Sequence, residues 1–207
     1  MTRPSLLLFL LLCCTLLLNA QEKPKKEKRG ISVGAFSGIY IPTGDNRILG
    51  ELYSLGIYGE ARFKKNGYGV NFGYLGKNNI PTSINFFATQ DNANFSLNKL
   101  TGMTISFDYS RELLEVNPIF FEGILSAGYS ELKYKFDTID PIQKPSFLFS
   151  PGIMTRWVIY ESGSGALHAR LKIQYNFVNL ALKESQVNRG TSGNYFSLNL
   201  TLGLATY

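Results

Sequence analysis

The side chains best suited to chemistry are few in this sequence, and the only imidazole is that of His168. Hydrolysis or acyl transfer requires a nucleophile or an activated water beside a base and an orienting group. The neighbours of His168 are Ala169 and Arg170, and no serine stands two positions away, where it would share a strand face with the imidazole. We therefore interpret His168 as a strand residue near a turn, not as a catalytic base.

Several carboxylates stand apart from one another and form no catalytic pair or metal-binding spacing. Asp137 and Asp140 lie close to prolines, Asp91 stands among asparagines, and Asp45 in the run PTGDN suits a turn. Both cysteines fall in an N-terminal apolar run. The sequence thus predicts no metal site, no cofactor and no enzymatic activity.

A further set of charged residues stands at alternate positions among small and polar residues. Glu60 precedes Arg62 by two residues, and Arg170 precedes Lys172 in the same way. Such a spacing places side chains on one face of an extended strand. The full set has three acids and four bases and consists of Glu60, Arg62, Asp108, Glu122, Arg156, Arg170 and Lys172.

The elements that must position these charges are strands. From Tyr195 onward, apolar residues at even positions alternate with small or polar residues at odd ones, and an α-helix would spread those apolar residues around its whole circumference. Seven earlier segments repeat this pattern: 31–41, 51–63, 68–75, 100–110, 119–130, 147–160 and 166–178.

The connections between these eight segments alternate in length. The longer ones are 42–50, 76–98, 136–145 and 183–193, and the shorter ones are 64–67, 111–117 and 161–165. Short turns on one side and longer loops on the other are typical of an up-and-down barrel in an outer membrane. We predict an all-β fold, an eight-stranded antiparallel up-and-down transmembrane β-barrel in which the last strand pairs with the first.

The choice between a membrane barrel and a soluble barrel depends on which face points inward. The polar face is rich in glycine, serine and threonine, whereas the bulky apolar and aromatic residues lie on the opposite face. An eight-stranded barrel has room inside for small side chains, so the bulky face should contact lipid. A soluble barrel with the inverse orientation is the alternative. Three aromatic residues, Phe36, Tyr40 and Tyr160, depart from this pattern because they fall on the small-residue face.

If the polar face points inward, the seven charged residues lie inside the barrel. Unpaired charges in a narrow interior are expensive, so acids and bases should pair across it. One hypothesis is a salt-bridge network that fills and stiffens a closed barrel. The other is a polarised pore or proton path. The small number of strands favours the closed barrel.

The N-terminus has the layout of a secretory signal peptide over residues 1–20. Arg3 precedes an apolar run from Leu6 to Leu18, which is too short for the roughly 20 residues of a spanning helix. Lipidation at Cys13 or Cys14 is the less favoured alternative.

Residues 21–30 form a basic tail of net charge +3 before a barrel at 31–207. We expect both mature termini on the periplasmic side, with the tail a spacer or a contact for lipid or a protein. No aromatic platform supports nucleic-acid binding.

The longest connection, residues 76–98, is the segment most suited to contacting a partner. It contains an apolar cluster at Ile84, Phe86 and Phe87 among asparagines. Two interpretations stay open. The cluster is a contact for a protein or glycan, or it is a strand extension that packs on itself.

The chain resembles the small outer-membrane β-barrel-domain proteins of the PorT-like group of the Bacteroidota, which share the eight-stranded OmpA/OmpX-type architecture. The resemblance rests on Leu18-Asn19-Ala20-Gln21, the glycine-spaced alternating strands and the last strand with Tyr207. It implies an outer-membrane location, contact with lipid and with the barrel-insertion machinery, and a possible part in protein secretion. Tyr207 departs from the usual insertion signal because it shares a face with Tyr195 and Asn199.

These observations together predict a non-enzymatic outer-membrane barrel. We expect a structural or adhesive role, or that of an accessory subunit of a membrane complex, exercised through the external loops. A narrow pore for small solutes is the first alternative, and a lipid-modifying enzyme is the second.

Overall fold

The computed structural model describes residues 29–78, 85–87, 94–136, 140–179 and 193–206. The predicted signal peptide, most of the basic tail, Ile84 and Tyr207 lie outside these residues. The described elements are β1 (Arg29–Pro42), the 3-10 helix η1 (Gly44–Leu49), β2 (Leu52–Phe63), β3 (Asn66–Asn78), β4 (Asn85–Phe87), β5 (Asn94–Val116), β6 (Ile119–Phe136), β7 (Ile142–Ser162), β8 (Gly165–Val178) and β9 (Tyr195–Thr206).

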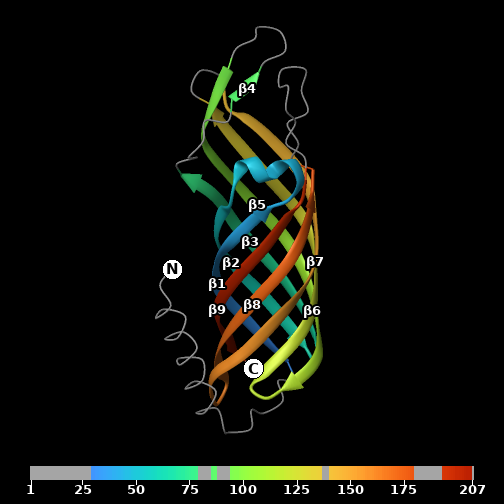
Figure 1. Ribbon diagram of the computed structural model, residues 1–207. Coiled ribbons are helices and arrows are strands. Elements are labelled where there is room, and N and C mark those ends of the chain that lie inside the picture. Colours follow the sequence, from blue (N-terminus) through green and yellow to red (C-terminus); the bar gives the residue numbers. More distant parts are fainter. Residues whose placement is uncertain (1–28, 79–84, 88–93, 137–139, 180–192, 207) are drawn as a thin grey trace, which may run out of the picture.

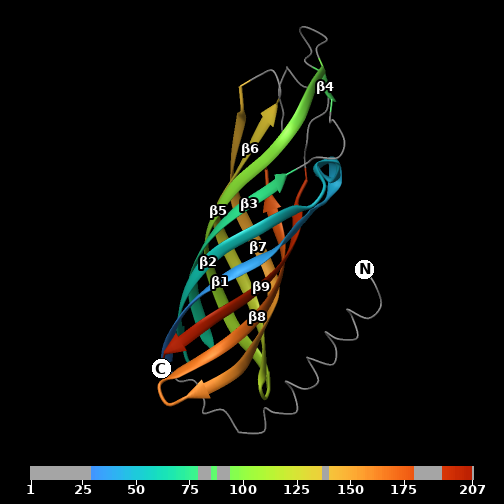
Figure 2. The same cartoon turned by 90° about the vertical axis from the view of Figure 1, so that its left-hand side faces the viewer.

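The strands close into a cylinder (Figures 1 and 2). Every strand pairs antiparallel with its neighbour in sequence, except that β3 pairs directly with β5 and leaves β4 outside the wall. The ring closes between β1 and β9, whose register runs from Ile31 opposite Thr206 to Pro42 opposite Tyr195. The predicted eight-stranded antiparallel up-and-down barrel is confirmed. Within the described residues, no helix is long and apolar enough to cross a membrane.

One end of the barrel carries the three tightest turns, and we call it the short-turn end. Two residues separate β2 from β3, β5 from β6, and β7 from β8. Two of these turns contain a residue with positive φ, Lys64 at 56° and Gly163 at 54°. Because β1 starts and β9 finishes at this end, the described chain enters and leaves the barrel there. The opposite end, which carries the remaining connections, is the long-connection end.

Three strands are longer than the sequence pattern predicts. The expected connection 111–117 is strand up to Val116, and β5 already begins at Asn94, inside the expected connection 76–98. β6 continues to Phe136 and β7 starts at Ile142. Ladder pairing between β5, β6 and β7 therefore continues beyond the barrel rim at the long-connection end (Figure 2). We call this part, residues 94–101, 131–136 and 142–146 with β4, the raised sheet.

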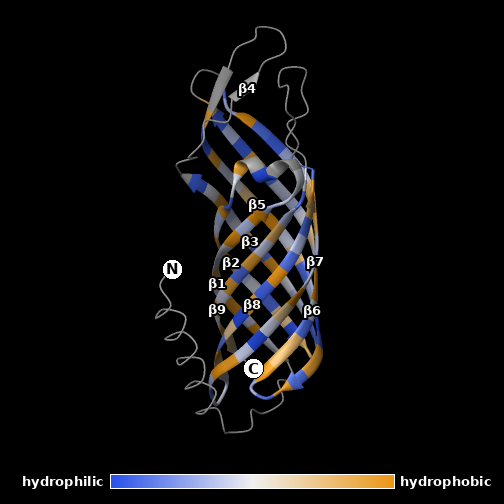
Figure 3. Cartoon of the chain, in the orientation of Figure 1, coloured by the Kyte–Doolittle hydropathy of each residue, from blue (hydrophilic) through white to orange (hydrophobic). Residues whose placement is uncertain are grey.

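The outer surface of the barrel is apolar and its interior is polar. Leu55, Ile57 and Leu204 keep 63–64 % of their side-chain surface exposed, whereas Ser54 and Asn199 on the inner face keep 2–3 %. The bands of apolar and polar residues alternate along each strand (Figure 3). This is the inverse of a soluble barrel and matches a lipid-facing wall.

Of the three aromatic residues that depart from the sequence pattern, two lie inside the barrel and one points outward. Tyr40 is buried inside the barrel, and the ring of Phe36 lies where a Cβ at Gly56 or Gly73 would touch it, so both glycines make room for it. The inward prediction for Tyr160 is wrong, because the side chain is 64 % exposed. A bulge between Val158 and Tyr160 shifts the register there and turns the ring outward.

Aromatic residues gather on the outer wall at both ends. At the short-turn end, the rings of Phe63 and Tyr68 lie 6.4 Å apart and those of Tyr68 and Tyr109 lie 5.5 Å apart. Towards the long-connection end, the ring of Tyr175 lies 4.9 Å from Phe177 and 4.8 Å from Phe196. Two such girdles bound the apolar band of membrane-spanning barrels, where amphipathic rings meet the lipid headgroups.

Candidate functional site

The seven charged residues singled out from the sequence all point into the barrel, and the structure brings them into two groups. They come from five strands: Glu60 and Arg62 from β2, Asp108 from β5, Glu122 from β6, Arg156 from β7, and Arg170 and Lys172 from β8. Alternation along each strand turns them inward, and the tilt of the strands brings residues distant in sequence to the same height.

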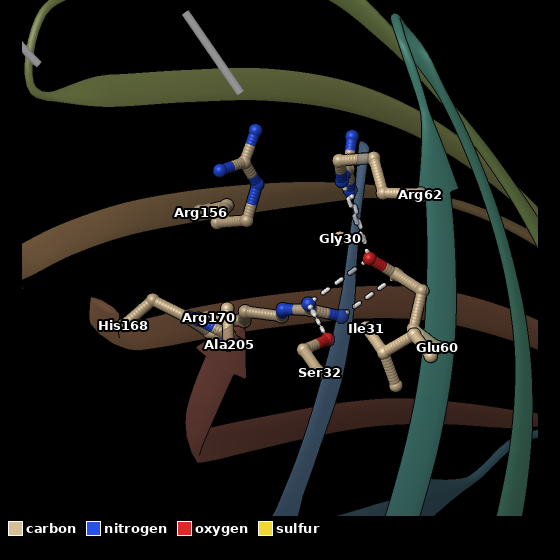
Figure 4. Close-up of a pocket in the computed structure, with 9 residues that line it drawn as sticks. All are labelled: Gly30, Ile31, Ser32, Glu60, Arg62, Arg156, His168, Arg170 and Ala205. Atoms are coloured by element: carbon tan, nitrogen blue, oxygen red, sulfur yellow. Dashed lines mark hydrogen bonds and ion pairs between the residues drawn. The ribbon is translucent and has the colours of Figure 1, made fainter. Parts of the chain in front are cut away.

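The larger group is a chain of ion pairs that crosses the interior near the short-turn end, and Figure 4 shows its part from Arg170 through Glu60 to Arg62. Arg170 contacts Glu60 with N–O distances of 2.8 and 3.0 Å. Glu60 also pairs with Arg62 at 3.1 Å, and Arg62 reaches Glu122 at 2.8 Å. Glu122 then accepts a bond from Arg156 at 2.9 Å. Three arginines and two glutamates thus join β8, β2, β6 and β7 across the lumen.

The smaller group is a pair nearer the middle of the barrel. The ammonium of Lys172 lies 2.9 Å from Asp108 Oδ2, and the hydroxyl of Ser106 donates to Asp108 Oδ1 at 3.2 Å. Both groups satisfy the demand that a buried charge be paired and hydrogen-bonded. In a water-filled passage, water would solvate these charged side chains, and they would not need to form ion pairs with each other.

His168 lies beside the ion-pair chain and is 1 % exposed. Its Nε2 is 2.7 Å from the hydroxyl of Tyr58, and the guanidinium of Arg170 stands 4.7 Å from the centre of the Tyr58 ring. Gly34 and Gly203 are needed here, because a Cβ at either position would overlap the Tyr58 side chain.

The cavity at His168 is too small for catalysis on a lipid. Its volume is about 10 Å³, and it is lined by Ser32, Glu60 and the three interior arginines among others. That is about the space of one water molecule, whereas an acyl chain needs a pocket tens of times larger. No described residue supplies a serine or carboxylate partner to the imidazole. The geometry thus gives His168 a packing and hydrogen-bonding role.

A layer of hydroxyl and amide side chains follows beyond the charges. Ser54 donates to Asn199 at 2.9 Å, and Asn176 bonds both Ser150 at 2.8 Å and Ser197 at 2.9 Å. The Ser54–Asn199 bond joins β2 to β9, two strands that are not ladder partners, whereas the two Asn176 bonds link β8 to its neighbours β7 and β9. They fill the middle of the barrel with fixed polar groups.

An apolar layer, which the sequence analysis missed, closes the interior at the long-connection end. Its central members, Leu49, Leu100 and Leu132, are 0 % exposed. Leu49 is the last residue of η1, and Lys77 bonds the carbonyl of that residue at 2.9 Å. The complete apolar plug consists of Tyr40, Leu49, Leu52, Leu75, Leu97, Leu100, Leu132, Tyr134, Phe136 and Tyr195.

A sequence signal for the apolar plug exists in β6. Alternation continues past residue 130, the expected strand end, through Leu132, Tyr134 and Phe136 on the inner face. Bulky residues on a face that is small and polar elsewhere are the sequence signal for this layer, because they fill the interior in place of small polar side chains.

The structure describes two of the three loop residues that were predicted as contacts. Phe86 and Phe87 belong to β4, which pairs with Asn94–Ser96 at the start of β5. β4 and the start of β5 therefore form a short antiparallel ladder in this segment, and the contact of Phe86 and Phe87 with a protein or glycan stays a prediction. In the described residues, no group of three or more His, Cys, Asp or Glu side chains could hold a metal ion.

The fold and the interior define a class: a transmembrane β-barrel whose lumen is occupied by its own side chains. No family model matches the sequence, and no curated protein matches it. Among solved structures, the chain is similar to a major outer membrane protein from Thermus thermophilus. The two share 16 % identity with a TM-score of 0.51, and the match covers 86 % of this chain and 98 % of that one. This likeness concerns the fold.

Two weaker likenesses have TM-scores below 0.5. Neisserial surface protein A has 13 % identity and a TM-score of 0.46, with 86 % of this chain and 96 % of that chain covered. Ail, the attachment invasion locus protein of Yersinia pestis, was solved in complex with the heparin analogue sucrose octasulfate. It has 11 % identity and a TM-score of 0.42, with 86 % and 97 % covered.

Proposed function

We propose that this protein is a closed, non-enzymatic barrel of the bacterial outer membrane that acts through its long-connection end. Its role is structural or adhesive, or that of an accessory subunit of a membrane complex. The barrel holds the raised sheet at the rim of the membrane-spanning wall, from the level of the lipid headgroups outwards. The short-turn end and both mature termini face the periplasm.

The observation that carries this proposal is the occupied interior. Ion pairs, hydroxyl–amide bonds and the apolar plug follow one another along the barrel axis, and each layer includes side chains from strands that are not ladder partners. A narrow pore, the first alternative, would have to cross all three layers. A lipid-modifying enzyme would need a cavity that His168 does not have.

The external role is supported by the raised sheet. β5 has 23 residues and β7 has 21, whereas β2 and β9 have 12 each. Part of this extra length, residues 94–98 of β5 and 142–147 of β7, lies at the long-connection end beyond the pairing with β3 and β8, and β5 pairs there with β4. A subunit of a secretion complex, as the PorT-like resemblance implies, is one form of such a role.

Deletion of residues 79–93 tests the external role. The barrel wall is formed without β4, so the shortened protein should keep the gel-mobility difference between boiled and unboiled samples that marks a folded barrel. Proteins that co-purify with the full chain from detergent-solubilised outer membranes should be lost. A matched control, K64Q/K65Q at the short-turn end, should keep them. Retention of every co-purifying protein after the deletion would contradict the role of this segment.

A further inference from the structure

Three lysines gather on the outer wall of the raised sheet. Lys99 of β5 and Lys135 of β6 stand directly opposite each other in the register, and Lys133 precedes Lys135 on the same face. All three side chains are exposed. Their sequence neighbours Leu100 and Tyr134 point inward and are 0 % exposed, so the lysines point away from the barrel axis.

This arrangement has an electrostatic cost that nothing in the described chain relieves. Like charges at opposite positions of an antiparallel pair lie about 4.5–5.5 Å apart at Cβ and destabilise the sheet. None of the ion pairs among the described residues involves these lysines. The one carboxylate on this face of β6 beyond the apolar band is Glu131, which accepts a 2.6 Å bond from the Tyr129 hydroxyl. On the outer face of β5 and β6 beyond the apolar band, three positive charges therefore stand beside one negative charge.

The height of the cluster on the barrel identifies what could supply the missing negative charge. Tyr129 and Phe147 are register partners at the edge of the apolar wall, and both are exposed. Lys133 follows Tyr129 by four residues, which at about 3.3 Å per residue and a strand tilt of about 40° is about 10 Å along the membrane normal. Lysine stems can bend back towards the apolar region while the ammonium stays hydrated. The ammonium groups therefore reach the level of the lipid headgroups.

We propose that Lys99, Lys133 and Lys135 bind the phosphate of a membrane lipid on the outer wall of β5 and β6. Thr101 and Gln143, the register partners of Lys133 on either side, add a hydroxyl and an amide donor at the same height. The acyl chains of the lipid lie against the exposed apolar residues below. This inference rests on the membrane placement in the proposed function and adds a specific ligand, a lipid phosphate group.

Native mass spectrometry of the full chain in a neutral detergent, titrated with diphosphorylated lipid A, tests the site. The variant K99Q/K133Q/K135Q should bind lipid A about 100-fold more weakly, because each lysine near an anionic headgroup contributes a factor of about five. Single K133Q should lose about fivefold. The control K64Q/K65Q/R111Q removes three exposed positive charges at the short-turn end and should bind as the unaltered protein does.

Three results would overturn the proposal. They are equal binding by the K99Q/K133Q/K135Q variant, an equal loss in the control, and displacement of lipid A by millimolar inorganic phosphate, which would make free phosphate the ligand. The gel-mobility difference on boiling shows that each variant is folded. Failure of the proposed closed barrel would appear as ion conductance, which this binding experiment does not measure, so the two failures are distinguishable.

Discussion

Glu122 lies deep in the barrel interior between two arginines. It is 1 % exposed and accepts from Arg62 on one side and Arg156 on the other. The sequence predicted that Glu122 faces inward among balanced charges. It could not predict Arg62 as a partner, because β2 reaches Glu122 only through the tilt and closure of the barrel, whereas Arg156 comes from β7, which pairs directly with β6.

Replacement of Glu122 with alanine should destabilise the barrel strongly. Two arginines would then share no carboxylate between them in a buried site, and breaking a buried pair costs about 3–5 kcal/mol. The measurement is the urea concentration at which half of the protein loses the unboiled gel mobility. Glu115→Ala, at an exposed position of β5, is the control and should change that midpoint little. Equal effects of the two substitutions would contradict the network.

Gly203 should tolerate no side chain while Tyr58 is present. A Cβ at this position would overlap the Tyr58 hydroxyl and approach His168 Nε2 to 3.0 Å, so we expect Gly203→Ala to destabilise the barrel by about 1–3 kcal/mol through overpacking. In the double variant with Tyr58→Phe, the loss should be smaller than the sum of the two single losses, because the hydroxyl that clashes is gone. Additive urea midpoints would mean that the two residues do not compete for space.

The strands β5, β6 and β7 carry the largest difference between expectation and structure. Alternation located every barrel strand and most inward and outward faces, because a lipid-facing wall imposes a strict period of two. At the long-connection end, β5 and β7 were predicted to start too late and β6 to end too early, since Asn98, Lys135 and Pro145 suggest loops. Cross-strand pairing outweighs that local preference in the raised sheet.

Two leucines of β6 provide a matched test of the apolar plug. Leu132 is 0 % exposed inside the barrel, whereas Leu125 is 42 % exposed on the outer wall. Leu132→Ala should cost about 2–5 kcal/mol, because it leaves a cavity among packed side chains. Leu125→Ala should cost less, because lipid can fill the space. The same urea titration compares them, and a larger loss for Leu125→Ala would place the core on the wrong face.

The whole molecule is a cylinder with an apolar outer surface that suits lipid and an interior filled by its own side chains. Its three interior layers differ in chemistry but have the same consequence, since side chains of several strands occupy the lumen in each. Such a barrel gains its rigidity from the interior, and in the proposed function the long-connection end makes the external contacts. The lysine cluster on the raised sheet fits this separation of outer surface and interior, because it lies on the outer wall and does not enter the lumen.

Ion conductance of the purified, folded protein in a planar bilayer tests the closed interior most directly. We predict no discrete openings from the full chain, because the ion pairs and the apolar plug leave no continuous water path. The unboiled gel mobility of the same sample confirms that the inserted protein is folded. Reproducible unitary openings from that sample would contradict the closed barrel and favour the narrow pore.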